Sequence, residues 1–177
     1  MTYKKGDISM LGKLSCLSRS SWYWLGLIIL GLSMEGIALF FQYGLNYGPC
    51  VLCIHVRIWV MALTAVAILG FFARKAPWGA KLSHLLMLVV SLGLTERSWQ
   101  TLAVERGWVI DSCSMNSGLP NWFALDQWFP QVFEPWEPCG YTPELLFGIT
   151  MAEGLMLISI LLLGVSILFS ALQFRRK

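Results

Sequence analysis

Two cysteines separated by two residues, Cys50 and Cys53 in the stretch GPCVLCIHVR, are the first candidates for chemistry. Such a pair can bind a metal, attach a haem, pack as small apolar side chains or exchange electrons. Gly48 and Pro49 precede the pair, and proline suits the first turn of a helix. In a first turn, unpaired N–H groups and the helix dipole favour a cysteine thiolate. Because thiolates attack disulfides, the sequence predicts a reactive thiol.

Metal and haem sites fit this pattern less well. A closed structural zinc site takes four nitrogen or sulfur ligands, and the chain has no second CxxC or HxxxH pair. Covalent haem attachment uses CxxCH, whereas Ile54 separates Cys53 from His55 here. We therefore predict no metal site and interpret His55 as a helix-surface or interface residue.

An arginine inside an apolar run is the second candidate. Arg57 follows Cys53 by four residues, which places it on the same helix face and about 6 Å deeper. An ionisable group within a membrane-spanning segment is a functional hypothesis by default. The structural alternative is that Arg57 reaches the interface or pairs with an acidic neighbour. Counting along the helices places further charged residues at this depth, which predicts a polar cluster beneath the cysteines with Glu35 as a candidate partner of Arg57. These residues are Glu35, Glu96, Arg97 and Glu153.

The elements that carry these residues are predicted to span a membrane. Of the 177 residues, 56% are hydrophobic and 13% charged, whereas soluble domains have about 25% charged residues. Four apolar runs can each form about 20 helical residues, enough to cross a hydrocarbon core of about 30 Å. They are approximately Trp22–Phe41, Val51–Ala73, Leu82–Val104 and Leu145–Phe174. We predict an all-α membrane protein, with a single integral membrane domain over residues 1–177 that forms a four-transmembrane-helix bundle with two extracytoplasmic loops.

Basic residues set the predicted orientation. If the chain crosses four times, ten of the 13 Lys and Arg residues fall on one side: Lys4, Lys5, Lys13, Arg19, Arg74, Lys75, Lys81, Arg175, Arg176 and Lys177. The other side has a short loop, Gln42–Pro49, and a long one, about Glu105–Glu144, with Arg106 as their one basic residue. The positive-inside rule puts both termini in the cytoplasm. The net charge of +3 follows from this topology and needs no nucleic-acid partner.

This topology sorts the cysteines. Cys50 and Cys53, at the end of the second helix, and Cys113 and Cys139, in the long loop, face an oxidising compartment, whereas Cys16 lies where thiols stay reduced. Four cysteines allow three pairings, of which Cys50–Cys53 with Cys113–Cys139 is the most economical. Taken alone, the loop pair is equally well explained as a structural staple that stabilises by roughly 3–4 kcal/mol.

The long loop has a segment suited to a membrane surface. Leu119–Phe133, LPNWFALDQWFPQVF, is rich in aromatic residues, and Trp and Tyr favour membrane interfaces. A loop held there keeps its cysteines near Cys50 and Cys53, and packing of the same aromatic residues on the helix ends predicts the same placement. The loop also carries acidic residues that we interpret mainly as solvated charges, namely Glu105, Asp111, Asp126, Glu134, Glu137 and Glu144.

A guanidinium one turn below a thiol can stabilise the thiolate or polarise a carbonyl of an apolar electron acceptor. A quinone fits this position and the need for a two-electron oxidant. The chain closely resembles the DsbB family of quinone-linked disulfide oxidoreductases. The likeness covers Trp22 to the fourth helix and is based on PCVLC followed by Arg57, on LDQWFPQVF, and on the cysteine spacing. Between Cys53 and Cys113 lie 59 residues, and between Cys113 and Cys139 lie 25.

The resemblance implies a location and a mechanism. The protein would lie in a bacterial inner membrane with its redox cysteines in the periplasm. A reduced thioredoxin-fold partner of the DsbA type would attack Cys113–Cys139, forming a mixed disulfide at Cys113. Electrons would then pass to Cys50–Cys53, and from Cys53 to ubiquinone or menaquinone, which Arg57 helps to bind. This type of relay keeps the bacterial periplasm oxidising.

Two positions depart from the family pattern, and alternatives follow. Val56 stands where the family often has glutamate, and no histidine lies near the outer end of the third helix. Gln100 is the nearest candidate there for quinone binding. The chain is alternatively a DsbI-type paralogue with a dedicated partner, or a membrane protein whose disulfides only staple loops. VKOR relatives carry their CxxC in the last helix, so the early motif here disfavours that family.

Overall fold

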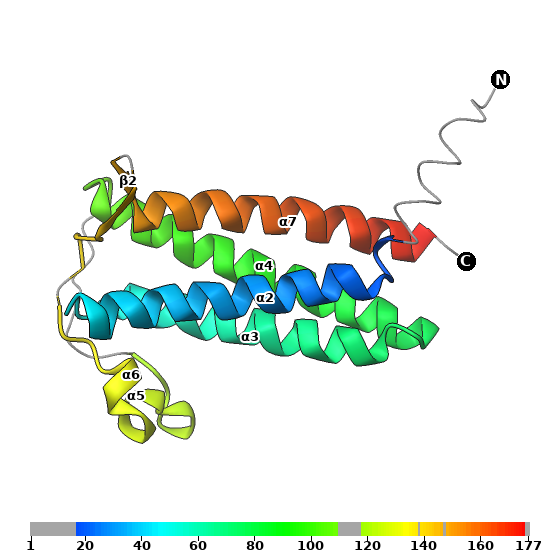
Figure 1. Ribbon diagram of the computed structural model, residues 1–177, viewed down its shortest axis with the longest axis horizontal. Helices are drawn as coiled ribbons and strands as arrows, with labels where there is room; N and C mark the ends of the chain where they lie inside the picture. Colours follow the sequence, from blue (N-terminus) through cyan, green and yellow to red (C-terminus); the bar gives the residue numbers. More distant parts are fainter. Residues whose placement is uncertain (1–16, 110–117, 138, 147, 176–177) are drawn as a thin grey trace.

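The computed structural model describes residues 17–109, 118–137, 139–146 and 148–175. Four long helices run side by side along the molecule (Figure 1), which confirms the predicted bundle. They are α2 (Ser21–Leu39), α3 (Val51–Ala73), α4 (Pro77–Glu105) and α7 (Met151–Arg175). Each is long and apolar enough to cross a membrane.

Helix α3 is central to the packing, because it lies against both α2 and α4, and α4 in turn lies against α7. The core is built from large apolar side chains with almost no exposed surface, namely Trp24, Leu63, Met87 and Leu94. Gly70 of α3 permits the close approach of α2, since a Cβ there would collide with the Trp24 indole. The large Trp24 side chain of α2 thus packs directly against the backbone of α3 at Gly70.

The outward faces of the four helices are apolar. Large side chains on them remain exposed, among them Ile29, Leu32, Leu69, Phe72, Leu157 and Leu161. Contiguous apolar surface of this kind marks an interaction with lipid or protein. Inside, small polar residues sit at helix contacts, as is common in membrane bundles. The Thr95 hydroxyl, for example, donates to the Ser159 carbonyl across α4 and α7 at 3.2 Å.

Among the first three helices, two boundaries differ from the predicted runs by three or more residues. The first helix does not stop at Phe41, because α2 continues as a π-helix, η1 (Phe40–Gly44). Gln42, predicted to begin a loop, is therefore helical and buried. Helix α4 begins at Pro77 rather than Leu82, with proline in the first turn after the extended Ala76. Hydropathy alone missed this start because Lys81 interrupts the apolar run, although its ammonium lies over the Trp78 ring.

The fourth helix begins later than predicted, at Met151. The residues before it form a two-stranded antiparallel hairpin, β1 (Glu144–Leu146) and β2 (Ile149–Thr150). Thr150 and Glu153 make a reciprocal capping box: the Glu153 N–H donates to the Thr150 hydroxyl at 3.3 Å, and the Thr150 N–H to the Glu153 carboxylate at 3.2 Å. The T-x-x-E pattern was a readable start signal within the apolar run.

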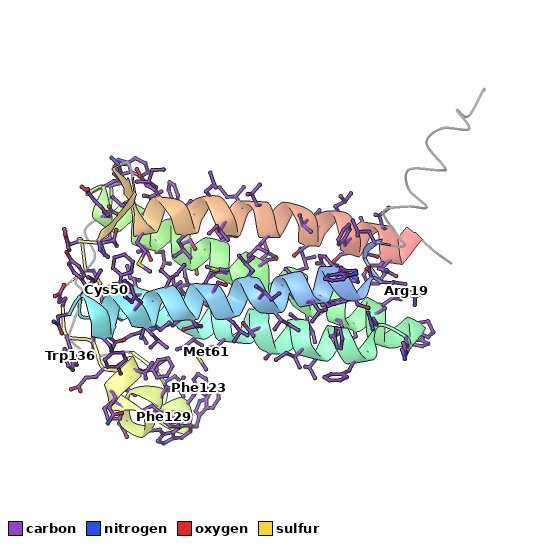
Figure 2. All side chains as sticks on the ribbon, viewed as in Figure 1. Arg19, Cys50, Met61, Phe123, Phe129 and Trp136 are labelled. Carbon is purple, nitrogen blue, oxygen red and sulfur yellow. A yellow bond between two sulfur atoms is a disulfide. The ribbon has the colours of Figure 1, made fainter. Side chains whose placement is uncertain are left out.

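The long loop adds three short helical turns, η2 (Asn121–Phe123), α5 (Leu125–Trp128) and α6 (Pro130–Phe133). They lie beside the end of the bundle where η1 ends and α3 begins (Figure 1). We call this end the loop end. Cys50 lies there, and Arg19 lies at the opposite end (Figure 2).

Candidate functional site

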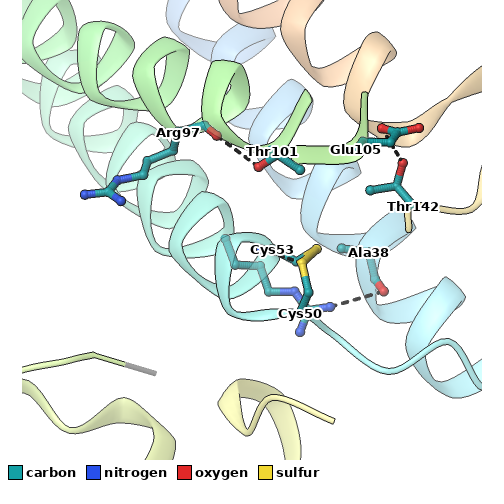
Figure 3. The surroundings of a disulfide bond; sticks show 8 residues. Ala38, Cys50, Cys53, Arg97, Thr101, Glu105 and Thr142 are labelled. Atoms are coloured by element: carbon teal, nitrogen blue, oxygen red, sulfur yellow. Dashed lines mark hydrogen bonds between the residues drawn. A yellow bond between two sulfur atoms is a disulfide. The ribbon is translucent and has the colours of Figure 1, made fainter. Parts of the chain in front are cut away.

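The first element of the site is the cysteine pair at the start of α3. Cys50 is the N-cap residue, with an extended backbone, and its sulfur accepts the N–H of Cys53 at 3.2 Å. Pro49 thus precedes the cap rather than occupying the first turn. The two cysteines form a disulfide with a Cα–Cα distance of 5.1 Å (Figure 3). Cys50 is buried and Cys53 half-buried, so the two sulfurs have different surroundings.

Arg57 lies one turn below Cys53, as predicted, and is 6% exposed. Its side chain is therefore buried within the protein rather than exposed on its surface. Its Nη1 donates to the Gln42 side-chain oxygen at 2.7 Å and to the Val132 carbonyl at 2.8 Å. Its Nη2 donates to the Ala38 carbonyl at 3.3 Å (Figure 3). The guanidinium therefore joins α3 to α2, η1 and α6.

Gln42 is a site residue that the sequence analysis missed. Its oxygen accepts from Arg57, and its Nε2 donates to the Gln131 carbonyl in α6 at 2.8 Å. The signal was helical spacing, since Glu35 and Gln42 are seven residues apart, and residues two turns apart share one helix face. A polar pair on the face that meets Arg57 was therefore readable.

A cavity of about 180 Å³ opens below the disulfide, and both Cys53 and Arg57 line it. Its walls come from α2, α3, α7 and the loops before α3 and before β1, with single contributions from η1 and α4. The lining is mostly apolar, for example Val56, Leu155 and Ile158. Helices α2 and α7 face each other across this space, whereas towards the opposite end of the bundle the Tyr23 ring of α2 packs on the Phe169 ring of α7 at a centroid distance of 4.9 Å.

Glu35 is the acidic group of the cavity. It lines the wall, and its Oε1 is buried with no hydrogen-bond partner in the described part of the chain. The expected pairing with Arg57 is electrostatic rather than a direct ion pair, since the ion pairs among the described residues are Arg97–Glu96 and Arg106–Glu153. The predicted polar cluster is thus divided: Glu35 joins Arg57 at the cavity, and the other charged residues pair elsewhere.

Gln100, the predicted helix-3 candidate, lies outside the cavity lining. Its side chain bonds Glu96 and Arg97 of its own helix. The lining residue of α4 is its neighbour Thr101, whose hydroxyl donates to the Arg97 carbonyl at 2.9 Å (Figure 3). A quinone-binding role for Gln100 stays a prediction that this placement does not support.

The long loop is held over the start of α3 on both sides of Cys139. Before it, the Trp136 N–H donates to the Pro49 carbonyl at 3.0 Å. After it, the Tyr141 ring packs on Tyr47 at a centroid distance of 6.3 Å, and a hydrogen bond between their hydroxyls is the main cause that raises the pKa of Tyr141. Three residues of chain span at most about 11 Å, so the Cα of Cys139 lies within that reach of the Trp136 Cα.

Close contact at this point depends on Gly48. A Cβ on Gly48 would lie 2.8 Å from the Trp136 Cβ and 3.2 Å from the Glu137 Cγ. The glycine before the CxxC motif, which the sequence analysis assigned to the helix start, therefore also admits the loop.

Cys113 and Cys16 lie outside the described residues. Cys139 is disulfide-bonded, and its pairing with Cys113 stays a prediction. Among the described residues, no group of three His, Cys, Asp or Glu side chains is arranged to hold a metal ion. The functional groups gathered here are thus one disulfide, a buried cation and a carboxyl group around an apolar cavity, with a second disulfide cysteine nearby.

The chain is similar to known disulfide bond formation proteins. The family model of the disulfide bond formation protein DsbB matches residues 20–169. Disulfide bond formation protein B 2 of Pseudomonas aeruginosa is 35% identical over 132 residues, which cover 73% of this chain and 78% of the relative. Disulfide bond formation protein B of Shewanella frigidimarina is 31% identical over 158 residues, 80% and 83% of the two chains. That of Photorhabdus laumondii is 31% identical over 154 residues, 85% and 89%.

Proposed function

Because this chain belongs to the DsbB family of disulfide bond formation proteins, we propose that it reoxidises a periplasmic thioredoxin-fold protein of the DsbA type and passes the electrons to a membrane quinone. Family membership and the four apolar helices make it a multi-pass membrane protein involved in disulfide bond formation. The single observation that carries the finer proposal is that Cys53 and Arg57 line one apolar cavity.

The cavity suits the ring of ubiquinone or menaquinone. A cavity of about 150 Å³ can hold benzene, so about 180 Å³ matches a quinone head group better than a whole isoprenoid lipid. A quinone ring is flat and apolar and has carbonyl oxygens that need hydrogen-bond donors. Arg57 would provide such donors from within an apolar wall, and the buried Glu35 oxygen has no partner in the described chain. When bound, a quinone supplies an acceptor for two electrons and two protons.

The loop cysteines would receive the electrons first. A thiolate of the partner attacks the Cys113 sulfur, and Cys139 leaves as a thiolate. The second partner thiolate then resolves the mixed disulfide, so the partner gains its disulfide and the loop pair becomes a dithiol. The contacts of Trp136 and Tyr141, on either side of Cys139, support transfer to the nearby Cys50–Cys53 pair. Thiol–disulfide exchange there reoxidises the loop pair and reduces the CxxC pair.

Two neighbours would support the reoxidation of Cys50 and Cys53. The start of α3 stabilises a thiolate through its N–H groups and dipole, and Arg57 adds a positive charge one turn below. Oxidation of the dithiol releases two electrons and two protons. Glu35, whose Oε1 is buried at the cavity, can hold one of these protons and donate it to the reduced acceptor. Overall, one dithiol and one quinone would give one disulfide and one quinol, so that two electrons and two protons are transferred.

The orientation belongs to the same proposal. The end opposite the loop end carries Arg19, Arg74, Lys75 and Lys81, which the positive-inside rule assigns to the cytoplasm. The loop end then faces the periplasm of a bacterium, with the protein in the inner membrane. This is the compartment in which disulfides form.

An anaerobic thiol count tests the proposal. Purified protein is reduced, freed of reductant and mixed with ubiquinone or menaquinone, and its free thiols are counted by alkylation. We expect disulfides to re-form at Cys50–Cys53 and at the loop pair, with one quinol for each disulfide. If thiols stay reduced with both quinones, the proposed function is wrong.

A further inference from the structure

We propose that Gln42 is a positioning residue that fixes Arg57 at the cavity and, through the same side chain, docks the α6 segment of the long loop. The inference is based on the proposed function in one respect, that the cavity binds a quinone. Gln42 touches neither sulfur and is not among the residues that line the cavity, so any effect on the reaction passes through Arg57 or the loop.

Gln42 accepts one hydrogen bond and donates another. Its Oε1 accepts from Arg57 at 2.7 Å, while its Nε2 donates to the Gln131 carbonyl at 2.8 Å. An amide is a neutral side-chain group that supplies an acceptor and a donor on separate atoms. The residue is 8% exposed, and a buried group deprived of a partner is costly. Both bonds are therefore needed in the folded protein.

The π-helix η1 places the Gln42 side chain in its buried position. A single π turn inside an α-helix changes the direction of the residues that follow, and such turns are common at functional sites. Within η1, Gln42 is buried while Phe40 and Tyr43 are exposed. The Tyr43 hydroxyl nevertheless reaches the same Gln131 carbonyl, at 2.6 Å. The end of the first spanning helix is thus shaped to hold the loop.

The loop is recognised through its main chain. Gln131 and Val132 belong to α6, a helix of one turn, and the last carbonyls of a helix lack partners within it. Gln42 and Tyr43 donate to the Gln131 carbonyl, and Arg57 donates to that of Val132 at 2.8 Å. These bonds do not involve the side chains of Gln131 and Val132. The docking therefore depends on the donor residues Gln42, Tyr43 and Arg57 rather than on the side chains of α6.

This docking is continuous with the approach of Cys139. The chain leaves α6 at Phe133 and returns to the bundle at Trp136, which bonds to Pro49 next to Cys50. The segment is thus fixed at its start by Gln42, Tyr43 and Arg57 and at its end by Pro49. The residue that sets the arginine at the cavity also sets the path of the chain that carries the loop disulfide.

Two substitutions separate these roles. Gln42→Glu keeps an acceptor for Arg57, removes the donor and sets a negative charge against the Gln131 carbonyl. Gln42→Met has a similar length and removes both bonds. The same changes at the exposed Gln127 of α5 are matched controls. Each full-length variant is compared with the wild type in lipid nanodiscs by hydrogen exchange of α5 and α6 and by direct titration with ubiquinone.

We expect Gln42→Glu to speed exchange in α6 while the quinone dissociation constant stays within about threefold of wild type. Gln42→Met should speed exchange and also raise that constant by about tenfold or more, the size expected when bonds to a charged group are lost. The Gln127 variants should change neither.

Wild-type values for both quantities in Gln42→Met would overturn the inference. Equal losses in both Gln42 variants would also overturn it, because they would indicate a general structural role. If the wild type itself binds no quinone, the proposed function fails, whereas the exchange measurement still decides whether Gln42 docks the loop.

Discussion

Arg57 of the second spanning helix donates a hydrogen bond to the main-chain carbonyl of Val132, 75 residues further along the chain, at 2.8 Å. Arg57 is 6% exposed and also lines the cavity below the Cys50–Cys53 disulfide. One buried cation therefore contacts both the candidate electron-acceptor site and the loop that carries Cys139. A charge within a spanning segment is costly, and here it has two uses.

Replacing Arg57 tests its role at the cavity. Arg57→Lys keeps the charge but cannot reproduce a planar group that bonds three partners, and Arg57→Met removes the charge as well. We expect the KM for quinone to rise by about tenfold to a hundredfold in Arg57→Met, as for loss of charged hydrogen bonds, and by less in Arg57→Lys. Steady-state rates at varied quinone and saturating dithiol partner measure this, and an unchanged KM in Arg57→Met would contradict the assignment.

A methyl group at Gly48 tests the docking of the loop beside the disulfide. Gly48→Ala puts a Cβ 2.8 Å from that of Trp136, and overpacking of this kind costs about 1–3 kcal/mol. We expect partner-driven quinone reduction to slow by about tenfold, a change of roughly 1.4 kcal/mol, because the loop is displaced from Pro49. Oxidation of a small dithiol that reduces Cys50–Cys53 directly should keep its rate.

The control for this variant is Gly26→Ala, since a Cβ at Gly26 meets nothing within 4 Å. It should match the wild type in both assays. Equal slowing with the protein partner and the small dithiol in Gly48→Ala would show that the substitution damages the cavity rather than the loop.

Loss of Cys139 should trap the partner. In Cys139→Ser, with Cys50 replaced as well to block exchange within the chain, Cys113 is left as a thiol that attacks the disulfide of an oxidised partner, which forms a mixed disulfide and frees one partner thiolate. No second loop thiol is left to displace the partner from Cys113. We expect a covalent complex on non-reducing gels that disappears with reductant. Cys16→Ser is the control and should form no such complex. Absence of the complex in the Cys139 variant would argue against attack at Cys113.

Glu35 should matter for turnover more than for binding. Glu35→Gln keeps the size of the side chain but cannot release a proton, so we expect kcat to fall by about a hundredfold or more, within the range of roughly 10²–10⁴ for general acid–base groups. The quinone KM should change little. Glu134→Gln, at an exposed loop position, is the matched control. An unchanged kcat in Glu35→Gln would remove the proton role.

Much of this site could be predicted because membrane physics leaves few choices. Long apolar runs must become helices in lipid, and the position of Arg57 below Cys53 follows from helix geometry alone. Both line one cavity in the structure. Cys53 lines the cavity whereas Cys50 is buried outside its lining. This difference depends on tertiary packing, which cannot be predicted from residue spacing.

The missed features share a physical cause. Hydropathy indicates which residues lie in the lipid, but near the membrane surface the residue at which a helix starts or ends is set by individual hydrogen bonds. Gln42 looked like the first loop residue but is kept helical by a π turn and two side-chain bonds. Met151 starts the last helix because Thr150 and Glu153 cap it. Gln100 was chosen by distance along the sequence, and the adjacent Thr101 is the residue that faces the cavity.

The central claim is that electrons from a soluble dithiol protein reach a quinone through Cys50 and Cys53. The most direct measurement combines the purified protein with a reduced thioredoxin-fold partner and ubiquinone or menaquinone without oxygen, and follows partner disulfides and quinol together. We predict one quinol for each partner disulfide, and neither product in Cys53→Ser. Partner oxidation that does not depend on quinone, or that continues in Cys53→Ser, would contradict the account.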